Sequence, residues 1–304
     1  MELFDTAPPA LCEQRLAAIA AEYFGIRAKI TVLASERDQN ARLKAEDRSY
    51  VLKIAHASED PDQLRMQNAT LAHLAAIGAP GVAQIVPTLA GESMARVDID
   101  GRDHFVRVVT WLDGSPLSQT PRSVAQLRDL GAFMGDLTHN MQGFGHPCAF
   151  RPDFVWSLDH VSRLRPWAQD IADPGNRGRV AALFDRYAEK IAPRLAGLRA
   201  SVLHQDANDN NVIVDAHNPD RVIGLIDFGD MAFGRTINEL AITLAYAILD
   251  AEDLYAAIRA VIEELLPDLR RELTSDDALD DLVRTLARRA CGTEIAFPAA
   301  DDGV

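Results

Sequence analysis

Cysteine is scarce in this chain of 304 residues, which contains only Cys12, Cys148 and Cys291. The three lie far apart and form no CxxC pair, so neither a disulfide framework nor a cysteine zinc site is expected. Long apolar runs are also missing, because no stretch approaches the roughly 20 residues that a membrane helix needs. The first residues carry acids and no basic segment, which is not typical of a signal peptide. These absences predict a cytoplasmic protein without a membrane partner.

Basic residues are few, with 31 Lys and Arg against 45 Asp and Glu and a formal net charge of −14. Binding to a nucleic-acid backbone depends on a basic surface, so this balance argues against DNA or RNA as a partner. An acidic chain is compatible with a cationic substrate, although solubility explains the charge equally well. With 48% hydrophobic residues and no repeats, the composition is that of an ordinary globular protein with a sizeable core.

The first third of the chain alternates short β-type segments with two helical ones. Apolar spacing over residues 11–24 before Gly25 predicts the first helix, and Asp60 followed by Pro61 predicts the start of the second, which ends near residue 77. Strands are expected at residues 30–33, 50–54, 83–86, 94–99 and 104–109, with a polar connection between the first two. Turn residues at 110–116 (TWLDGSP) then indicate a hinge.

Beyond the hinge the pattern is mostly helical. Helices are expected at residues 120–141, 179–195, 237–249, 252–265 and 276–289, and short strands at 201–203 and 221–226. The sequence therefore predicts an α+β protein of two lobes, with a small antiparallel sheet in residues 1–111 and a mostly helical lobe in residues 112–304. Ligands usually bind in the cleft at such a junction.

The chemistry is concentrated in two motifs that lie beside β-type segments. One reads HQDANDNN over residues 204–211, and the other reads LIDFGD over residues 225–230. Phosphoryl transfer needs a carboxylate to orient the attacking hydroxyl, hard oxygen ligands for magnesium and a cation for the phosphates. We therefore predict Asp206 as the general base and Asn211 and Asp227 as magnesium ligands. The alternative is that these acids cap turns, and His204 is expected to pack and shape its loop.

Lys53 is the predicted anchor for the nucleotide phosphates. It interrupts the apolar segment VLKIA, where a lysine is costly unless it is paired or turned to a cleft. An exposed face of a half-buried strand is the alternative. The preceding turn has no GxGxxG, so Ser35, Gln39 and Asn40 are expected to bind phosphate oxygens, unless the turn is an ordinary polar hairpin.

With these motifs the chain resembles the aminoglycoside phosphotransferase/choline kinase family. The matching positions are His204, Asp206, Asn211 and Asp227. The resemblance covers about residues 28–249 and is strongest to hydroxylysine kinase-type members, which include kinase modules fused to class III aminotransferases. It implies a protein-kinase-like fold and magnesium-dependent transfer from ATP or GTP to an amine-bearing alcohol. It also implies a possible fusion or association with an aminotransferase module.

The partner of Lys53 departs from the pattern of kinases of this fold, and the residues that bind the acceptor have more than one interpretation. The strand lysine normally pairs with a helix glutamate, whereas the best-placed residue here is Gln67, whose amide can orient an ammonium group without adding a full charge. For an acceptor with an ammonium group, Asp230, Glu239 and Asp250 are candidate ligands. Glu239 is equally well explained as a structural acid.

Three alternatives to a small-molecule kinase follow from the same motifs. A degenerate kinase fold would bind nucleotide without catalysis, but the intact set of Asp206, Asn211, Asp227 and Lys53 argues against it. A protein kinase is disfavoured because the glycine loop and an HRD–APE pair are missing. A magnesium hydrolase using the same acids would release phosphate without an acceptor.

Overall fold

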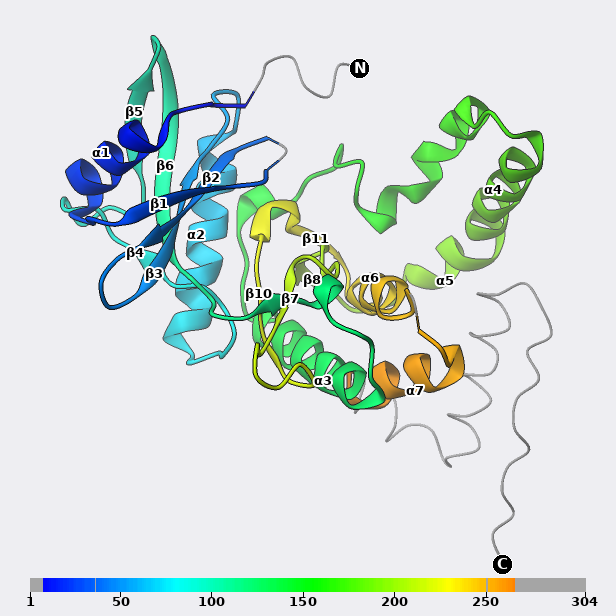
Figure 1. The fold of residues 1–304 in the computed structure, drawn as a ribbon. Helices are drawn as coiled ribbons and strands as arrows, with labels where there is room; N and C mark the ends of the chain where they lie inside the picture. The colour runs from blue at the N-terminus through cyan, green and yellow to red at the C-terminus, as the bar shows by residue number, and fades with distance from the viewer. Residues whose placement is uncertain (1–7, 36, 250, 266–304) are drawn as a thin grey trace, which may run out of the picture.

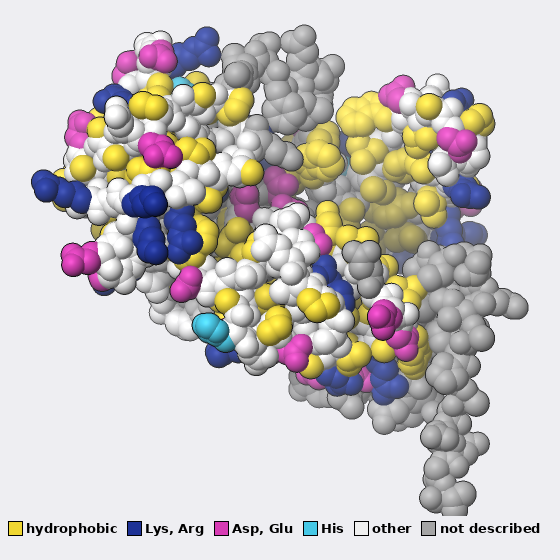
Figure 2. Space-filling model, in the orientation of Figure 1, with side chains coloured by type: hydrophobic (Ala, Val, Ile, Leu, Met, Phe, Trp, Pro, Cys, Tyr) yellow, Lys and Arg dark blue, Asp and Glu magenta, His cyan; other side chains and the backbone are white. Residues whose placement is uncertain are grey.

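The computed structural model describes residues 8–35, 37–249 and 251–265, which form two lobes with a hollow between them (Figures 1 and 2). The helix predicted at residues 276–289 and the candidate Asp250 lie outside the described residues. Within these ranges no helix is long and apolar enough to cross a membrane.

The N-terminal lobe is built on a six-stranded antiparallel sheet in the order β1-β2-β3-β6-β4, with β5 paired to β6. Its strands are β1 (Lys29–Leu33), β2 (Gln39–Lys44), β3 (Ser49–Ile54), β4 (Ile85–Val86), β5 (Ala95–Ile99) and β6 (Arg102–Thr110). Strand β2 was predicted as a polar connection, which was wrong. Its sequence is QNARLK, and its buried positions alternate along the strand, so apolar content alone did not reveal it.

Two helices cover opposite faces of this sheet: α1 (Glu13–Phe24) and α2 (Pro61–Ala76). The predicted signals operate at both, since α1 ends at Gly25 with φ 68° and the Asp60 side chain accepts from the Asp62 N–H at 2.9 Å. Leu52 belongs to the core under α1. Successive strand residues point to opposite faces, so the next residue, Lys53, faces the cleft.

The C-terminal lobe is mostly helical, as predicted. Its larger helices are α3 (Val124–Met141), α4 (Pro174–Arg186), α6 (Ile237–Ala247) and α7 (Leu254–Leu265). The start predicted at residue 120 was early, because Ser123 caps α3 by accepting from the Gln126 N–H at 3.0 Å. The helix predicted at 179–195 is interrupted by a π-helical turn at Tyr187–Ile191 before α5 (Ala192–Leu195). Figure 1 shows α4 and α5 on an arm beside the lobe.

Small β units in the C-terminal lobe flank the two polar motifs of the sequence. They are a sheet of β7 (Ser115–Pro116), β9 (Val212–Val214) and β10 (Val222–Leu225), and a pair of β8 (Ala200–Leu203) and β11 (Ala232–Arg235). Because β6 ends at Thr110 and β7 already pairs with β9, the chain crosses between the lobes at residues 111–114. The predicted division at residues 111 and 112 lies in this crossing.

The lobes also touch where the connection between α2 and β4 meets β10. The Gly81 carbonyl accepts from the Leu225 N–H at 2.9 Å, and Val82 bridges to Leu225 in parallel. A Cβ on Gly224 would lie 2.5 Å from that carbonyl oxygen, so only glycine permits this approach. The contact fixes the strand that leads into the LIDFGD motif against the N-terminal lobe.

Candidate active site

His204 shapes the loop of residues 204–211 between β8 and β9. Its Nε2–H donates to the Ile226 carbonyl at 3.1 Å, and its Nδ1 accepts from the Asp206 N–H at 3.2 Å. The ring meets Phe228 edge-on at 4.7 Å between centroids. Burial lowers the pKa of His204 to about 4, so the imidazole is neutral at neutral pH. The residue packs and orients the loop, as expected.

Glu239 holds the same loop from helix α6. It is 2% exposed, and its carboxylate accepts from the backbone N–H groups of His204 at 3.3 Å and Gln205 at 2.7 Å. Burial raises the pKa of Glu239 to about 7. The prediction that Glu239 binds substrate is therefore corrected: its carboxylate is committed to the backbone beside Asp206, and the structural alternative describes it.

Asp206 is held by two carboxamides. Asn208 Nδ2 donates to Asp206 Oδ1 at 2.8 Å, and Asn211 Nδ2 donates to Oδ2 at 2.7 Å. Burial raises the pKa of Asp206 to about 6, and the nearby carboxylates of Asp230 and Asp227 act in the same direction. A carboxylate fixed in place with a pKa near neutrality suits a general base.

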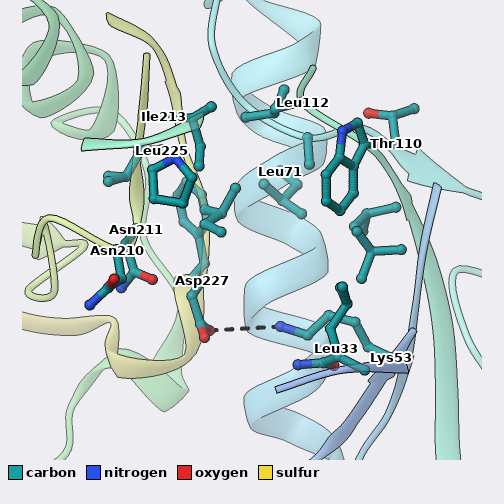
Figure 3. A pocket seen from close by; sticks show the side chains of 18 of the residues that line it. Leu33, Lys53, Leu71, Thr110, Leu112, Asn210, Asn211, Ile213, Leu225 and Asp227 are labelled. Atoms are coloured by element: carbon teal, nitrogen blue, oxygen red, sulfur yellow. Dashed lines mark ion pairs between the residues drawn. The ribbon is translucent and has the colours of Figure 1, made fainter. Parts of the chain in front are cut away.

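Asp227 lies directly after β10 and meets Lys53 from the other lobe. Its backbone has φ 63°, and its Oδ1 accepts from the Gly229 N–H at 3.3 Å. Lys53 Nζ lies 3.7 Å from the same oxygen, the contact drawn in Figure 3. The positive charge of Lys53 lowers the pKa of Asp227, so this carboxyl is ionised at neutral pH.

The oxygen atoms in this region suit a hard cation whose other ligands are phosphates and water. Asp227 offers a carboxylate, and Asn211 offers a carboxamide oxygen because its nitrogen is bonded to Asp206. In the part of the chain that the structure describes, no group of three or more His, Cys, Asp and Glu side chains forms a metal site. Mg²⁺ is usually held by one or two carboxylates together with phosphates and water. The two predicted ligands fit that arrangement.

Two adjoining cavities fill the cleft. The first, of about 350 Å³, is mainly apolar (Figure 3), and the residues that line it include Val51, Trp111 and Ile226. The second, of about 450 Å³, is polar, and Figure 2 shows acidic side chains on the floor of the hollow between the lobes. The residues that line both include Asn40, Lys53, Gln67, Arg107, Asn211 and Asp227.

The predicted phosphate loop is only partly turned to this space. Ser35 lines the polar cavity, and Asn40 lines both and donates through Nδ2 to Ser35 Oγ at 3.1 Å. Gln39 is buried on the other side, where its amide exchanges two 2.8 Å hydrogen bonds with the backbone of Leu11. Placing Gln39 at the phosphates was wrong, because it and Asn40 begin strand β2 and point to opposite faces.

The predicted contact between Gln67 and Lys53 is also corrected. Gln67 Oε1 accepts from the guanidinium of Arg107 on β6, whereas Lys53 pairs with Asp227. Arg107 was missed at the level of sequence. It interrupts the apolar segment FVRVVT as Lys53 interrupts VLKIA, so the same argument about a charge within an apolar strand had the information to find it.

Comparison with known proteins identifies the family of this chain. The model of the phosphotransferase enzyme family matches residues 29–273. The chain belongs to this family. Hydroxylysine kinase of Mus musculus is 28% identical over 270 residues, covering 81% of this chain and 72% of that protein. Amicoumacin kinase of Bacillus subtilis is 23% identical over 274 residues, covering 88% and 78%. The predicted resemblance and the phosphotransferase class are confirmed.

Solved structures place the phosphotransferase in the predicted two-lobe, protein-kinase-like fold. An amicoumacin kinase in complex with AMP-PNP, Ca²⁺ and Ami aligns with a TM-score of 0.64 at 18% identity, over 95% of this chain and 89% of that one. A microcompartment-associated aminopropanol kinase aligns with a TM-score of 0.54 at 17% identity, over 91% and 95%. At these identities the alignments establish the fold, and the chemistry has to be argued from the site.

The polar cavity of the phosphotransferase contains a further acid. Glu59 lines it together with Asp206 and Asp230, and pairs with Arg37 at 2.8 Å. Burial raises the pKa of Glu59 above its ordinary value. Arg151 lies at the same cavity and donates to the Gly229 carbonyl at 3.2 Å, which ties it to the segment after Asp227. Acids and guanidinium groups therefore face the space next to the base.

Proposed function

We propose that this phosphotransferase transfers the γ-phosphoryl group of ATP, with Mg²⁺, to the hydroxyl of a small amine-bearing alcohol. The observation that carries the proposal is one polar cavity lined by Lys53, Asp206, Asn211 and Asp227, opening onto an apolar cavity beside the hinge. GTP is the alternative donor, because the apolar walls favour a purine without distinguishing the two bases.

The chemistry follows from the positions of these groups. The acceptor hydroxyl attacks the γ-phosphorus, its O–P bond forms, the bond to the bridging oxygen breaks and the nucleoside diphosphate leaves. Asp206 orients the hydroxyl and takes its proton. Asp227 and Asn211 would hold the cation, which neutralises phosphate charge when bound. Lys53 would bind phosphates that are not transferred, supported by Ser35 and Asn40.

An ammonium group on the acceptor is supported by the acids beside the base. Asp230 and Glu59 both line the polar cavity with Asp206, whereas Glu239 is turned away from it. Similar proteins carry the names hydroxylysine kinase and aminopropanol kinase, which denote acceptors with an amine and a hydroxyl. We expect Asp230 to bind that amine, whereas Glu59 already pairs with Arg37.

The test is a coupled assay of nucleoside diphosphate release with Mg²⁺. ATP and GTP are each paired with 5-hydroxylysine, 1-amino-2-propanol, ethanolamine, choline, homoserine and an aminoglycoside. Release that depends on one acceptor, and is lost in Asp206→Asn but kept in the exposed control Asp136→Asn, supports the kinase. Release without an acceptor indicates a hydrolase. Nucleotide binding without turnover of any acceptor favours a binding module.

Two interpretations of the sequence stay predictions. One is location in the cytoplasm, and the other is fusion or association with an aminotransferase module. Fractionation of the native cells tests the first. Affinity purification of the tagged chain from its native cells, followed by an aminotransferase assay of the proteins that co-purify with it, tests the second.

A further inference from the structure

Arg107 places a second cation next to Lys53. The two residues are direct partners in the pairing of β3 with β6. Side chains opposite each other in an antiparallel pair have Cβ atoms about 4.5–5.5 Å apart, and like charges there are destabilising. Arg107 is 5% exposed, so water does little to screen the repulsion. The sheet thus holds two positive charges side by side at the floor of the cleft.

Neutral groups hold the guanidinium in place. It donates to Gln67 Oε1 and, at 3.1 Å, to Asn68 Oδ1, both on α2. Asn68 is itself oriented, because its Nδ2 donates to Ser93 Oγ at 3.1 Å. Amide oxygens satisfy N–H groups without adding a negative charge. An arginine keeps its charge at neutral pH, even though burial lowers the pKa of Arg107.

Three carboxylates lie near Arg107 without forming an ion pair with it. Carboxylates of Asp38, Asp227 and Glu59 attract the guanidinium. Two of them are already engaged, since Asp227 pairs with Lys53 and Glu59 pairs with Arg37. Asp38 Oδ1 accepts from the His56 N–H at 3.1 Å. Among the described residues, the guanidinium is hydrogen-bonded to amide oxygens and to no carboxylate, so it can still donate to an anion. The residue also lines both cavities of the cleft.

We propose that Arg107 and Lys53 form a two-cation phosphate site, in which Arg107 is fixed by Gln67 and Asn68 and donates to a nucleotide phosphate that is not transferred. Arginine has five N–H donors, and its bonds to the two amides use two of them. The inference rests on the proposed function, because it assumes that nucleotide phosphates enter this cleft. It also explains the amide at position 67, where a carboxylate would neutralise Arg107.

A purely structural role makes a different prediction. If Arg107 only ties β6 to α2, its removal changes the binding of all nucleotides alike. If it binds phosphate, its removal affects nucleotides according to how many phosphates they carry. The number of phosphates on the ligand is therefore the variable that separates the two roles.

Calorimetric titration with adenosine, AMP, ADP and AMP-PNP in Mg²⁺ measures this dependence for the wild type and Arg107→Met. We expect the affinity of the variant for AMP to change less than twofold and that for AMP-PNP to fall about tenfold or more, as for loss of a hydrogen bond to a charged group. Lys44→Met, an exposed lysine of β2, is the matched control and should bind as the wild type does. Equal losses for AMP and AMP-PNP, or none, would overturn the inference.

A second variant, Gln67→Glu, tests the inference with Arg107 still in place, so it does not depend on the folding of Arg107→Met. Gln67→Glu should lower the affinity for AMP-PNP about tenfold, because its new carboxylate would pair with Arg107. In the double variant with Arg107→Met the two losses should not add, because both changes remove the same interaction between Arg107 and the phosphate. A Gln67→Glu protein with unchanged affinity contradicts the inference. A wild type that binds no phosphorylated nucleotide overturns both proposals, whereas binding without acceptor turnover overturns the proposed function alone.

Discussion

The side-chain amide of Asn211 donates to Asp206 twice, to its backbone oxygen at 2.9 Å and to its Oδ2 at 2.7 Å. The proposed base and one proposed metal ligand are thus joined by hydrogen bonds. Because the side-chain nitrogen of Asn211 is hydrogen-bonded to Asp206, the side-chain oxygen is the atom that can bind a cation. In the proposed mechanism, these hydrogen bonds fix the distance between the base and the metal ligand.

Asp206→Asn should remove the base while leaving the nucleotide site in place. General-base catalysis contributes on the order of 10²-fold or more, so we expect kcat to fall by at least that factor. The Kd for AMP-PNP should change little, because the nucleotide is bound by other residues. Steady-state kinetics and calorimetry measure the two quantities. Asp136→Asn is the control, and wild-type turnover in Asp206→Asn would assign the base elsewhere.

The pH dependence of activity should follow the ionisation of Asp206. Burial raises the pKa of Asp206 to about 6, so this side chain is protonated at a higher pH than an ordinary aspartate. Because a protonated Asp206 cannot act as a base, the activity of the enzyme should fall below about pH 6. His204, with a pKa of about 4, stays neutral through this window, whereas Glu239, with a pKa of about 7, also titrates near it. Asp230→Asn is therefore the variant that identifies Asp206. Asp230 raises the pKa of Asp206, so Asp230→Asn should move the acidic limb of kcat/KM to lower pH. An unmoved limb in a pH–rate profile contradicts this assignment.

Asp227→Asn should separate metal binding from nucleotide binding. The amide keeps the shape of the side chain but loses the charge that attracts a cation and pairs with Lys53. We expect the Mg²⁺ concentration for half-maximal rate to rise about tenfold or more, which corresponds to roughly 1.4 kcal/mol. Titration of the rate with Mg²⁺ at saturating ATP gives this value. An unchanged Mg²⁺ dependence moves the metal site away from Asp227.

Much of the framework was predictable because its signals are local. The cap at Asp60 and the stop at Gly25 act within a few residues of themselves, and the structure uses both as expected. Strand β2 was missed because its polar residues and its buried Ala41 and Leu43 alternate within a short segment. Missing the strand led directly to the error at Gln39, because the side of a strand residue depends on register.

Tertiary context decided the remaining site residues. A glutamate in INELA reads the same whether it faces a ligand or a backbone, and only the packing of α6 against the loop turned Glu239 to the N–H groups of His204 and Gln205. Similarly, Gln67 and Arg107 lie 40 residues apart in sequence, so their bond depends on how α2 packs on the sheet. Local patterns carry no information on such pairs.

Glu239→Gln tests the corrected role of this acid. The amide can accept only one of the two backbone hydrogen bonds, which leaves an N–H of the loop beside Asp206 without its acceptor. The unpaired N–H should let the loop that positions Asp206 shift, and misplacement of a catalytic group by about 1 Å can cost on the order of 10²-fold, so we expect kcat to fall about tenfold or more. The acceptor KM should stay within about twofold. A large increase in acceptor KM with kcat unchanged would return Glu239 to the substrate site.

Gly224→Ala should weaken the contact between the lobes. The new Cβ would lie 2.5 Å from the Gly81 oxygen that accepts from Leu225, so either the carbonyl or β10 must move. Overpacking of this kind costs typically about 1–3 kcal/mol, and each kcal/mol lowers Tm by about 2–4 °C in a protein of this size. Thermal unfolding measures the shift, with Gly143→Ala as control because nothing lies within 4 Å of its Cβ. Because β10 leads into Asp227, activity should fall with stability, and a variant as stable and active as the wild type would show that the close approach is dispensable.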